Sequence, residues 1–256
     1  RTERAPLEPL DERLEWERDG QYFHYLTRWV HALEQVARVT RDRRYYAWAV
    51  ELFLAAHAGF VASDRAGRGT FRMYWKMDVD LSRPLVASMG QHDPLDGWIT
   101  GLRLRESRFA SEDDRGALAR PIGEFREMCR AGGWTTSDPL GIGGLLTDAW
   151  RLDGIVAQAE DVTDSQIADL LRDATDGLAW HGQAGHLEGP AFTRLAFREL
   201  GLAIGLHALE RMRHSGQHGS GIDATGLSEA FDSAVRFLPL AERIERIRPA
   251  TFSSSF

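Results

Sequence analysis

The apolar residues of this chain recur mostly with the spacing of an α-helix. In residues 22–39 they form one broad stripe, which is typical of a helix with a single buried face. Residues 43–62 are apolar on nearly every side, so we expect a helix that packs on more than one face. The same spacing predicts further helices at 94–107, 117–130, 139–158, 164–181, 190–213 and 225–246.

Strand-like sequence is scarce. The stretch TFRMYWKMDVDL is the main exception, because its side chains alternate as they do in an extended segment. The chain is therefore predicted to be all-α with a small β-hairpin excursion near residues 70–82. We expect one domain over residues 1–256, with irregular tails at 1–13 and 247–256.

Two segments of the chain echo each other. HDPLDGWITGLRL begins at His92 and SDPLGIGGLLTDAWRL at Ser137, so their Asp-Pro steps lie 45 residues apart; a third proline-opened helix, GPAFTRLAFRELGLAIGL, follows about 51 residues later. Asp before Pro suits a helix start, because Asp caps the helix and Pro takes a position that needs no N–H. A recurrence every 45–50 residues, with two helices in each repeat, is typical of stacked helical hairpins.

The loops between the predicted helices fall into two alternating sets. If the helices run up and down, every second loop lies at the same end. One set reads as plain connectors (40–44, 105–116 and 158–164), and the other is rich in Trp, His, Asp, Gln and Arg (14–21, 63–97, 131–139 and 181–190). We expect function at the second end. The glycine-rich helices entered there, at 141–146 and 201–206, are predicted to converge closely, as in the inner ring of a barrel; the alternative is loose packing in a bundle.

Charge and composition exclude several classes of protein. The chain has 256 residues and a net charge of −7, with its arginines scattered among acids, which argues against binding to nucleic acid. No run of 18 apolar residues suggests a membrane span, and the first twenty residues lack the apolar segment of a signal peptide. The single cysteine, Cys129, excludes an internal disulfide. We expect a cytoplasmic protein that needs no metal and no cofactor.

Lys76 is the only lysine among the 31 basic residues. In an extended segment it would share a face with Asp78 and Asp80. Repulsion between the two aspartates would raise the pKa of one, and a compact ammonium would keep the other ionised. Such a pair is what glycoside hydrolysis requires, one carboxyl as acid and one as base or nucleophile. The alternative is an amphipathic hairpin whose charged side faces water.

The segment MGQHDPLDG supplies a second group of polar residues. Asp93 and Asp96 open a helix, and the helix dipole favours the carboxylate form of Asp93, which suits a base or nucleophile better than an acid. We therefore predict catalytic roles for Asp78, Asp80, His92 and Asp93. The predicted substrate-binding residues are Asp19, Tyr22, His24, Trp75, Lys76, Gln91, Asp96, Trp98, Trp134, Asp138, His186 and Arg194.

Five segments resemble a bacterial group within the six-hairpin glycosidase-like proteins: DGQYFHYLTRWVHAL, RMYWKMDVDLSRPL, SMGQHDPLDG, DPLGIGGLLTDAWRL and RLAFRELGLAIGLHA. The resemblance spans roughly residues 14–245 and implies an α/α toroid with its site at the mouth formed by the long loops. Related toroids include unsaturated glucuronyl hydrolases, α-mannan-degrading hydrolases and N-acylglucosamine 2-epimerases. Six hairpins need twelve helices, whereas the sequence predicts about eight.

Three functions follow as hypotheses. The first is a carbohydrate-active enzyme, a hydrolase that acts on a small-molecule or oligosaccharide substrate through its paired aspartates. The second is a sugar epimerase or isomerase on the same scaffold, with His24, His92 or His186 carrying the proton. The third is a toroid without catalytic activity that binds a glycan or a protein.

Overall fold

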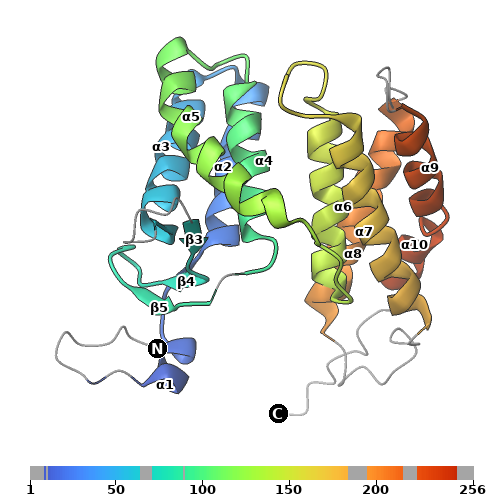
Figure 1. Ribbon diagram of the computed structural model, residues 1–256, viewed down its shortest axis with the longest axis horizontal. Helices are drawn as coiled ribbons and strands as arrows, with labels where there is room; N and C mark the ends of the chain where they lie inside the picture. The colour runs from blue at the N-terminus through green and yellow to red at the C-terminus, as the bar shows by residue number, and fades with distance from the viewer. Residues whose placement is uncertain are drawn as a thin grey trace. The chain divides into compact units, whose positions relative to one another are not determined.

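The computed structural model describes residue 9 and residues 11–63, 71–88, 90–183, 195–215 and 224–246. Of these residues, 71% are helical, and the rest include short antiparallel strands, as the sequence predicts. The chain divides into two compact units, unit 1 (Arg1–Gly132) and unit 2 (Gly133–Phe256). Figure 1 shows the helices and strands of each unit. A closed toroid over the whole chain stays a prediction.

Unit 1 consists of helical hairpins above a small β-region. Its helices are α1 (Glu12–Glu17), α2 (Phe23–Thr40), α3 (Arg43–Phe60), α4 (Asp93–Arg105) and α5 (Glu112–Met128), followed by the short 3-10 helix η1 (Cys129–Ala131). The strands are β1 (Gln21–Tyr22), β2 (Val61–Ser63), β3 (Phe71–Met73), β4 (Lys76–Met77) and β5 (Pro84–Val86). They form two antiparallel sheets, ordered β1-β4-β5 and β2-β3.

Helix α4 is the central helix of unit 1. It contacts α2, α3 and α5, and every residue from Asp93 to Leu102 is buried. Its neighbours there are aromatic or aliphatic, since Phe125 of α5 packs on Gly97 while Ile122 and Phe53 pack on Gly101. Two carboxyl groups, those of Asp93 and Asp96, are buried at the first turn of this helix.

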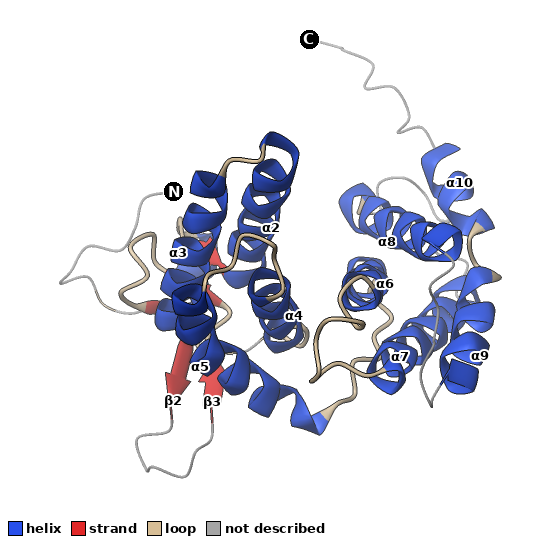
Figure 2. Ribbon diagram, turned by 90° about the horizontal axis from the view of Figure 1, so that it is seen from above, coloured by secondary structure: helices blue, strands red, loops and turns tan. Residues whose placement is uncertain are grey.

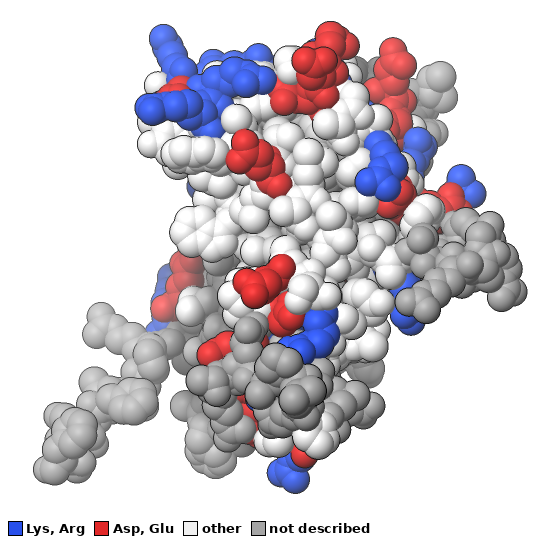
Figure 3. Space-filling model, turned by 90° about the vertical axis from the view of Figure 1, so that its left-hand side faces the viewer, with Lys and Arg blue, Asp and Glu red and all other residues white. Residues whose placement is uncertain are grey.

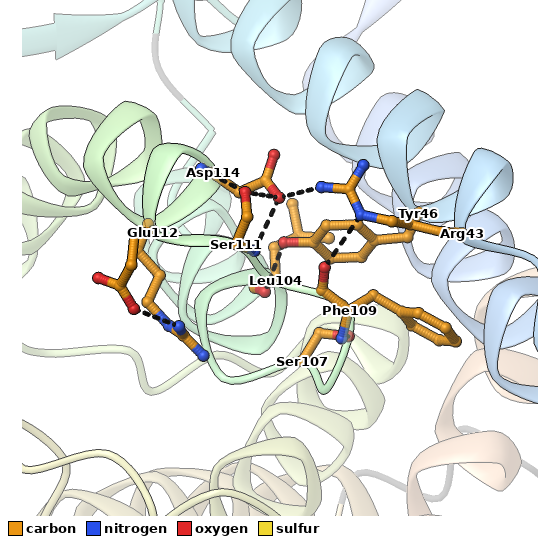
Figure 4. Close-up of polar contacts among 9 residues, drawn as sticks. Arg43, Tyr46, Leu104, Ser107, Phe109, Ser111, Glu112 and Asp114 are labelled. Atoms are coloured by element: carbon orange, nitrogen blue, oxygen red, sulfur yellow. Dashed lines mark hydrogen bonds and ion pairs between the residues drawn. The ribbon is translucent and has the colours of Figure 1, made fainter.

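The two connectors of unit 1 meet at one end, as the alternation of loops predicts. Figure 4 shows Arg43 donating to the carboxylate of Asp114 at 2.6 Å and to the carbonyl of Phe109 at 3.4 Å. The buried hydroxyl of Tyr46 donates to the carbonyl of Leu104, and Ser111 with Asp114 forms a capping box at the start of α5. Figure 3 shows the side of the molecule that lies on the left in Figure 1, and basic and acidic side chains lie beside one another at its upper end. We assign the hydrogen bonds of Arg43, Tyr46 and Ser111 a structural role.

Unit 2 contains α6 (Pro139–Asp153), α7 (Asp164–Gln183), α8 (Ala196–Ser215), α9 (Ala224–Val235) and α10 (Pro239–Arg246). Helix α6 lies between α7 and α8, while α9 packs on α7 and α10 on α8 (Figure 2). An ion pair of 2.8 Å joins Asp138, which caps α6, to Arg198 in the first turn of α8. The N-terminal ends of these two helices therefore meet, as the alternation predicts within this unit.

Helices α6 and α8 cross at glycines with their backbones in contact. A Cβ on Gly143 would overlap the carbonyl oxygen of Gly201, and one on Gly205 would overlap the carbonyl oxygen of Gly143. The predicted close convergence of the two glycine-rich helices is thus confirmed, because only hydrogen fits where these backbones touch. That they belong to an inner ring stays a prediction.

Two local predictions were wrong. Residues 14–21 were expected to be a loop, but Asp11 caps a short helix, α1, through the N–H groups of Arg13 and Leu14. The predicted helix 225–246 is interrupted, because residues 236–238 form turns and Pro239, which has no N–H to continue α9, opens α10.

Candidate functional site

Asp93 is the most unusual side chain of unit 1. It is 6% exposed, and its Oδ2 has no hydrogen-bond partner among the described residues. The backbone of Gly90 covers it: the Gly90 N–H donates to the carboxyl group, and a Cβ on Gly90 would overlap Oδ2. A buried carboxyl group with an unused oxygen is costly as an anion, so it favours the protonated form.

Asp96 lies one turn further along α4 in a different environment. It is buried too, but it accepts hydrogen bonds from Thr27 of α2 at Oδ2 and from Thr100 at Oδ1, the latter at 3.4 Å. The guanidinium of Arg28 lies 4.0 Å from its Oδ2. Hydroxyl donors and a nearby cation stabilise a carboxylate. The two aspartates of this turn are therefore held in unlike surroundings.

The protonation of Asp93 differs from the expectation based on the helix dipole. Burial, and then the negative charge of Asp96, raise the pKa of Asp93 to about 7, against the lowering effect of the Gly90 N–H. The expected preference for the carboxylate was wrong, because a helix N-terminus contributes about 0.3–1 kcal/mol, and the raised pKa shows that burial outweighs it. At neutral pH Asp93 is thus suited to donate a proton.

A cluster of aromatic rings lies at the start of α2. The ring of Tyr22 meets the rings of Trp75 and Tyr25 edge to face, with ring centres 5.6 Å and 5.4 Å apart. Its centre lies 5.7 Å from that of the His24 ring. Burial lowers the pKa of His24, while the charge of Asp96 raises it by less and that of Arg28 lowers it. His24 is therefore mostly neutral at pH 7, within the electrostatic influence of Asp96. Tyr22, His24 and Trp75 are only partly buried, and Tyr25 is exposed.

Lys76 is 1% exposed, and its ammonium binds backbone rather than the expected aspartates. Its Nζ donates to the carbonyl of Glu15 at 3.0 Å and to that of Arg18 at 2.5 Å, and it lies 5.5 Å from the centre of the Tyr22 ring. Burial lowers the pKa of Lys76, and the charges of Glu15 and Asp19 oppose that shift. Lys76 thus ties the end of α1 to the sheet, at the side of the aromatic cluster.

Asp78 and Asp80 lie in different surroundings. Asp78 is buried and accepts hydrogen bonds from the backbone and hydroxyl of Ser82 and from the Arg83 N–H. Burial alone would raise the pKa of Asp78, but these donors and the Arg83 charge lower it overall, so the expected repulsive rise is not found there. Asp80 lies exposed in the turn that follows. Asp78 is well placed to hold the 78–83 turn, and a catalytic role for either residue stays a prediction.

The other predicted site residues lie in unit 1, in unit 2 or outside the described residues. His92 precedes α4 and Gln91 is exposed beside it, while Trp98 is buried with its Nε1 unpaired within the described ranges. Trp134 and Asp138 belong to unit 2, where the Trp134 N–H donates to Asp173. His186 and Arg194 lie outside the described residues. Among the predicted residues of unit 1, the ring of Tyr22 lies beside those of His24 and Trp75 and near the Lys76 ammonium, while Asp93 and Asp96 share the first turn of α4.

Sequence reasoning missed Thr27, Arg28 and Gly90. A signal existed for Thr27, because this polar residue stands between Leu26 and Val30 on the buried stripe of α2. A threonine at a core position needs a buried partner, here the carboxylate of Asp96. Nothing in the local sequence indicates that Gly90 covers Asp93.

Comparison with known proteins adds no family to this description. No family model, curated protein or solved structure matches the chain. The resemblance to six-hairpin glycosidase-like proteins thus stays a prediction. Within the described part of the chain, no three His, Cys, Asp or Glu side chains gather as a metal site, and no helix is long and apolar enough to cross a membrane.

The raised pKa of Asp93 predicts how stability depends on pH. Folded Asp93 keeps its proton up to about pH 7, whereas unfolded Asp loses it near its ordinary value of 3.8. Between these values the folded state binds more protons, so the free energy of unfolding falls as pH rises. Relative to that of Asp93→Asn, the free energy of unfolding of the wild type should fall by roughly 3–4 kcal/mol between pH 4 and pH 8. Urea titrations of both proteins measure this difference, and a flat or rising difference contradicts the assignment.

Replacement of Lys76 is expected to release α1. In Lys76→Met the apolar stem stays, but the carbonyls of Glu15 and Arg18 lose their donor, which should cost about 2–3 kcal/mol of unfolding free energy. Hydrogen exchange should rise across residues 11–18. The matched control is Arg72→Met on the exposed side of β3, for which we expect a change within about 0.5 kcal/mol. Unaltered exchange in Lys76→Met would show that α1 does not depend on the ammonium.

Proposed function

We propose that this protein is a carbohydrate-active enzyme, specifically a glycoside hydrolase that uses Asp93 as general acid and Asp96 as its ionised partner. The observation that carries the proposal is the buried carboxyl of Asp93, with a pKa of about 7 beside a second carboxyl that is hydrogen-bonded. Two carboxyl groups whose environments separate their pKa values are typical of an acid–base pair. The α/α toroid implied by the resemblance belongs to the same proposal.

The placement of both residues in one helical turn is compatible with this chemistry. Residues three apart on a helix have Cβ atoms about 5–6 Å from each other, and glycosidase carboxyls are separated by about 5–9.5 Å. Asp93 would protonate the departing oxygen, while Asp96 as carboxylate would accept a proton from water or attack the sugar. Tyr22, Tyr25 and Trp75 would offer ring faces to the sugar, because aromatic rings pack well against its apolar side.

An epimerase or isomerase is the second candidate, and His24 favours it. This histidine is kept neutral by burial and lies within the electrostatic reach of Asp96, so it has the form needed to accept a proton from a carbon acid. The two candidates share a site but differ in the bond that is broken. A hydrolase cleaves a C–O bond, whereas an epimerase exchanges a C–H hydrogen with solvent.

The test is a panel of oligosaccharides incubated with the protein in D₂O and followed by proton NMR. The hydrolase predicts new reducing ends and a single anomer in the first product. Deuterium in an uncleaved sugar would instead support the epimerase. Binding of a glycan with neither cleavage nor exchange would overturn both and leave a binding protein.

A further inference from the structure

Thr27 places one hydroxyl between two acceptors. Its side chain is 2% exposed on α2, and Oγ1 lies 3.0 Å from the carbonyl oxygen of His24 and within a short hydrogen bond of Asp96 Oδ2. A hydroxyl carries one hydrogen, so it can donate to only one of these oxygens at a time. Donation to a carbonyl one turn back is common for threonine in helices. The proton on Asp96 therefore decides which way the hydroxyl points.

Two hydrogen-bond arrangements are possible for Thr27 Oγ1, Asp96 Oδ2 and the His24 carbonyl oxygen. When Asp96 is a carboxylate, Thr27 donates to Oδ2. When Asp96 is protonated at Oδ2, Asp96 donates to Thr27 Oγ1 and the Thr27 hydroxyl turns to the carbonyl of His24. Each state of the carboxyl group keeps a hydrogen bond in a buried position, where losing one would be costly.

We propose that Thr27 is a positioning residue whose hydroxyl turns between Asp96 and the His24 carbonyl, so that Asp96 can act both as a carboxylate and as an acid. This inference rests on the proposed acid–base function. In the hydrolytic step, the proton of Asp93 goes to the leaving oxygen as the sugar C–O bond breaks. An O–H bond of water breaks, its oxygen joins the sugar carbon and its proton goes to Asp96. The O–H bond of Thr27 turns but never breaks.

The groups that face Asp96 differ in what they can do. Arg28 has donors but no acceptor, so it stabilises the carboxylate alone. The side chain of His24 is neutral, and Asp93 is the protonated member of the carboxyl pair. Where α3 and α5 contact Gly97 and Gly101 of α4, their side chains are apolar: Phe53, Ile122 and Phe125. Thr27 supplies both a donor and an acceptor to the same carboxyl oxygen.

The experiment is an NMR titration of the intact protein with ¹³C-labelled aspartate carboxyls and ¹³C-labelled histidine carbonyls, without substrate. In wild type at pH 6, the proton shared by the pair should lie mainly on Asp93. In Thr27→Val a larger share should lie on Asp96, because the carboxylate has lost its buried donor. Thr27→Ser should restore the wild-type distribution. Thr100→Val, the matched control at the longer hydrogen bond, should leave it unaltered.

A second reading is specific to the turning hydroxyl. The carbonyl signal of His24 should shift as Asp96 titrates in wild type and Thr27→Ser, and should stay constant in Thr27→Val. A constant His24 carbonyl in wild type, or a Thr27→Val protein that titrates as wild type, overturns the proposal. If Thr27→Val fails to fold, the wild type and Thr27→Ser still decide it. Neither reading depends on turnover, so failure of the hydrolase proposal is recognised separately.

Discussion

Replacing Asp93 with asparagine is expected to reduce hydrolytic turnover about 10²–10⁴-fold, the range for loss of a positioned acid. Asparagine matches aspartate in size but has no proton to give at neutral pH. The same change removes a carboxyl group that is costly to bury, so the protein should become more stable at pH 8. Steady-state hydrolysis and urea unfolding at pH 8 measure the two effects together.

Asp114→Asn is the matched control within unit 1. Asp114 lies at the connector end, where it accepts from Arg43 and from the Ser111 hydroxyl (Figure 4). Burial would raise the pKa of Asp114, but Ser111 and Arg43 lower it overall, so the effect on stability should have the opposite sign. We expect Asp114→Asn to lower the free energy of unfolding by about 1 kcal/mol and to leave turnover unaltered. Equal turnover in Asp93→Asn and Asp114→Asn would rule out Asp93 as the acid.

The second large effect is expected at the crossing of α6 and α8. Gly143→Ala should destabilise unit 2 by about 3 kcal/mol, at the upper end of the usual cost of overpacking, because the new Cβ would overlap the carbonyl of Gly201 and a backbone cannot turn aside as a side chain can. Urea unfolding and hydrogen exchange of α6 and α8 measure the loss.

The neighbouring residue provides the control for this substitution. A Cβ on Gly144 meets no heavy atom of the described residues within 4 Å. Gly144→Ala should therefore stabilise the helix by about 0.5–1 kcal/mol. If both substitutions had the same effect, helix propensity rather than backbone contact would explain the role of Gly143.

Helices were predictable here because they are encoded by local spacing. The stripe of residues 22–39 predicts α2 almost to its ends, and the Asp-Pro steps mark the starts of α4 and α6. The interruption at Pro239 was predictable too, since proline lacks the N–H that a helix interior needs. Local patterns also indicated that alternate loops gather at one end within each unit.

The state of each polar group was not predictable, since it depends on neighbours distant in sequence. Asp93 and Asp138 share the sequence Asp-Pro-Leu, yet Asp93 is buried with no ion pair to any described residue, whereas Asp138 pairs with Arg198 at 2.8 Å. Lys76 was expected beside Asp78 and Asp80, but its ammonium donates to carbonyls 58 and 61 residues earlier in the chain. No spacing rule encodes contacts of that kind.

The proposed chemistry requires Asp93 to hold a proton at neutral pH. Infrared spectra of the intact protein, recorded as the pH is raised from 5 to 9, measure this directly. We predict a carboxylic-acid C=O band that is lost with a midpoint near pH 7 and is missing from Asp93→Asn. A wild-type protein whose aspartates are all ionised by pH 5, with no band that depends on Asp93, would contradict the account.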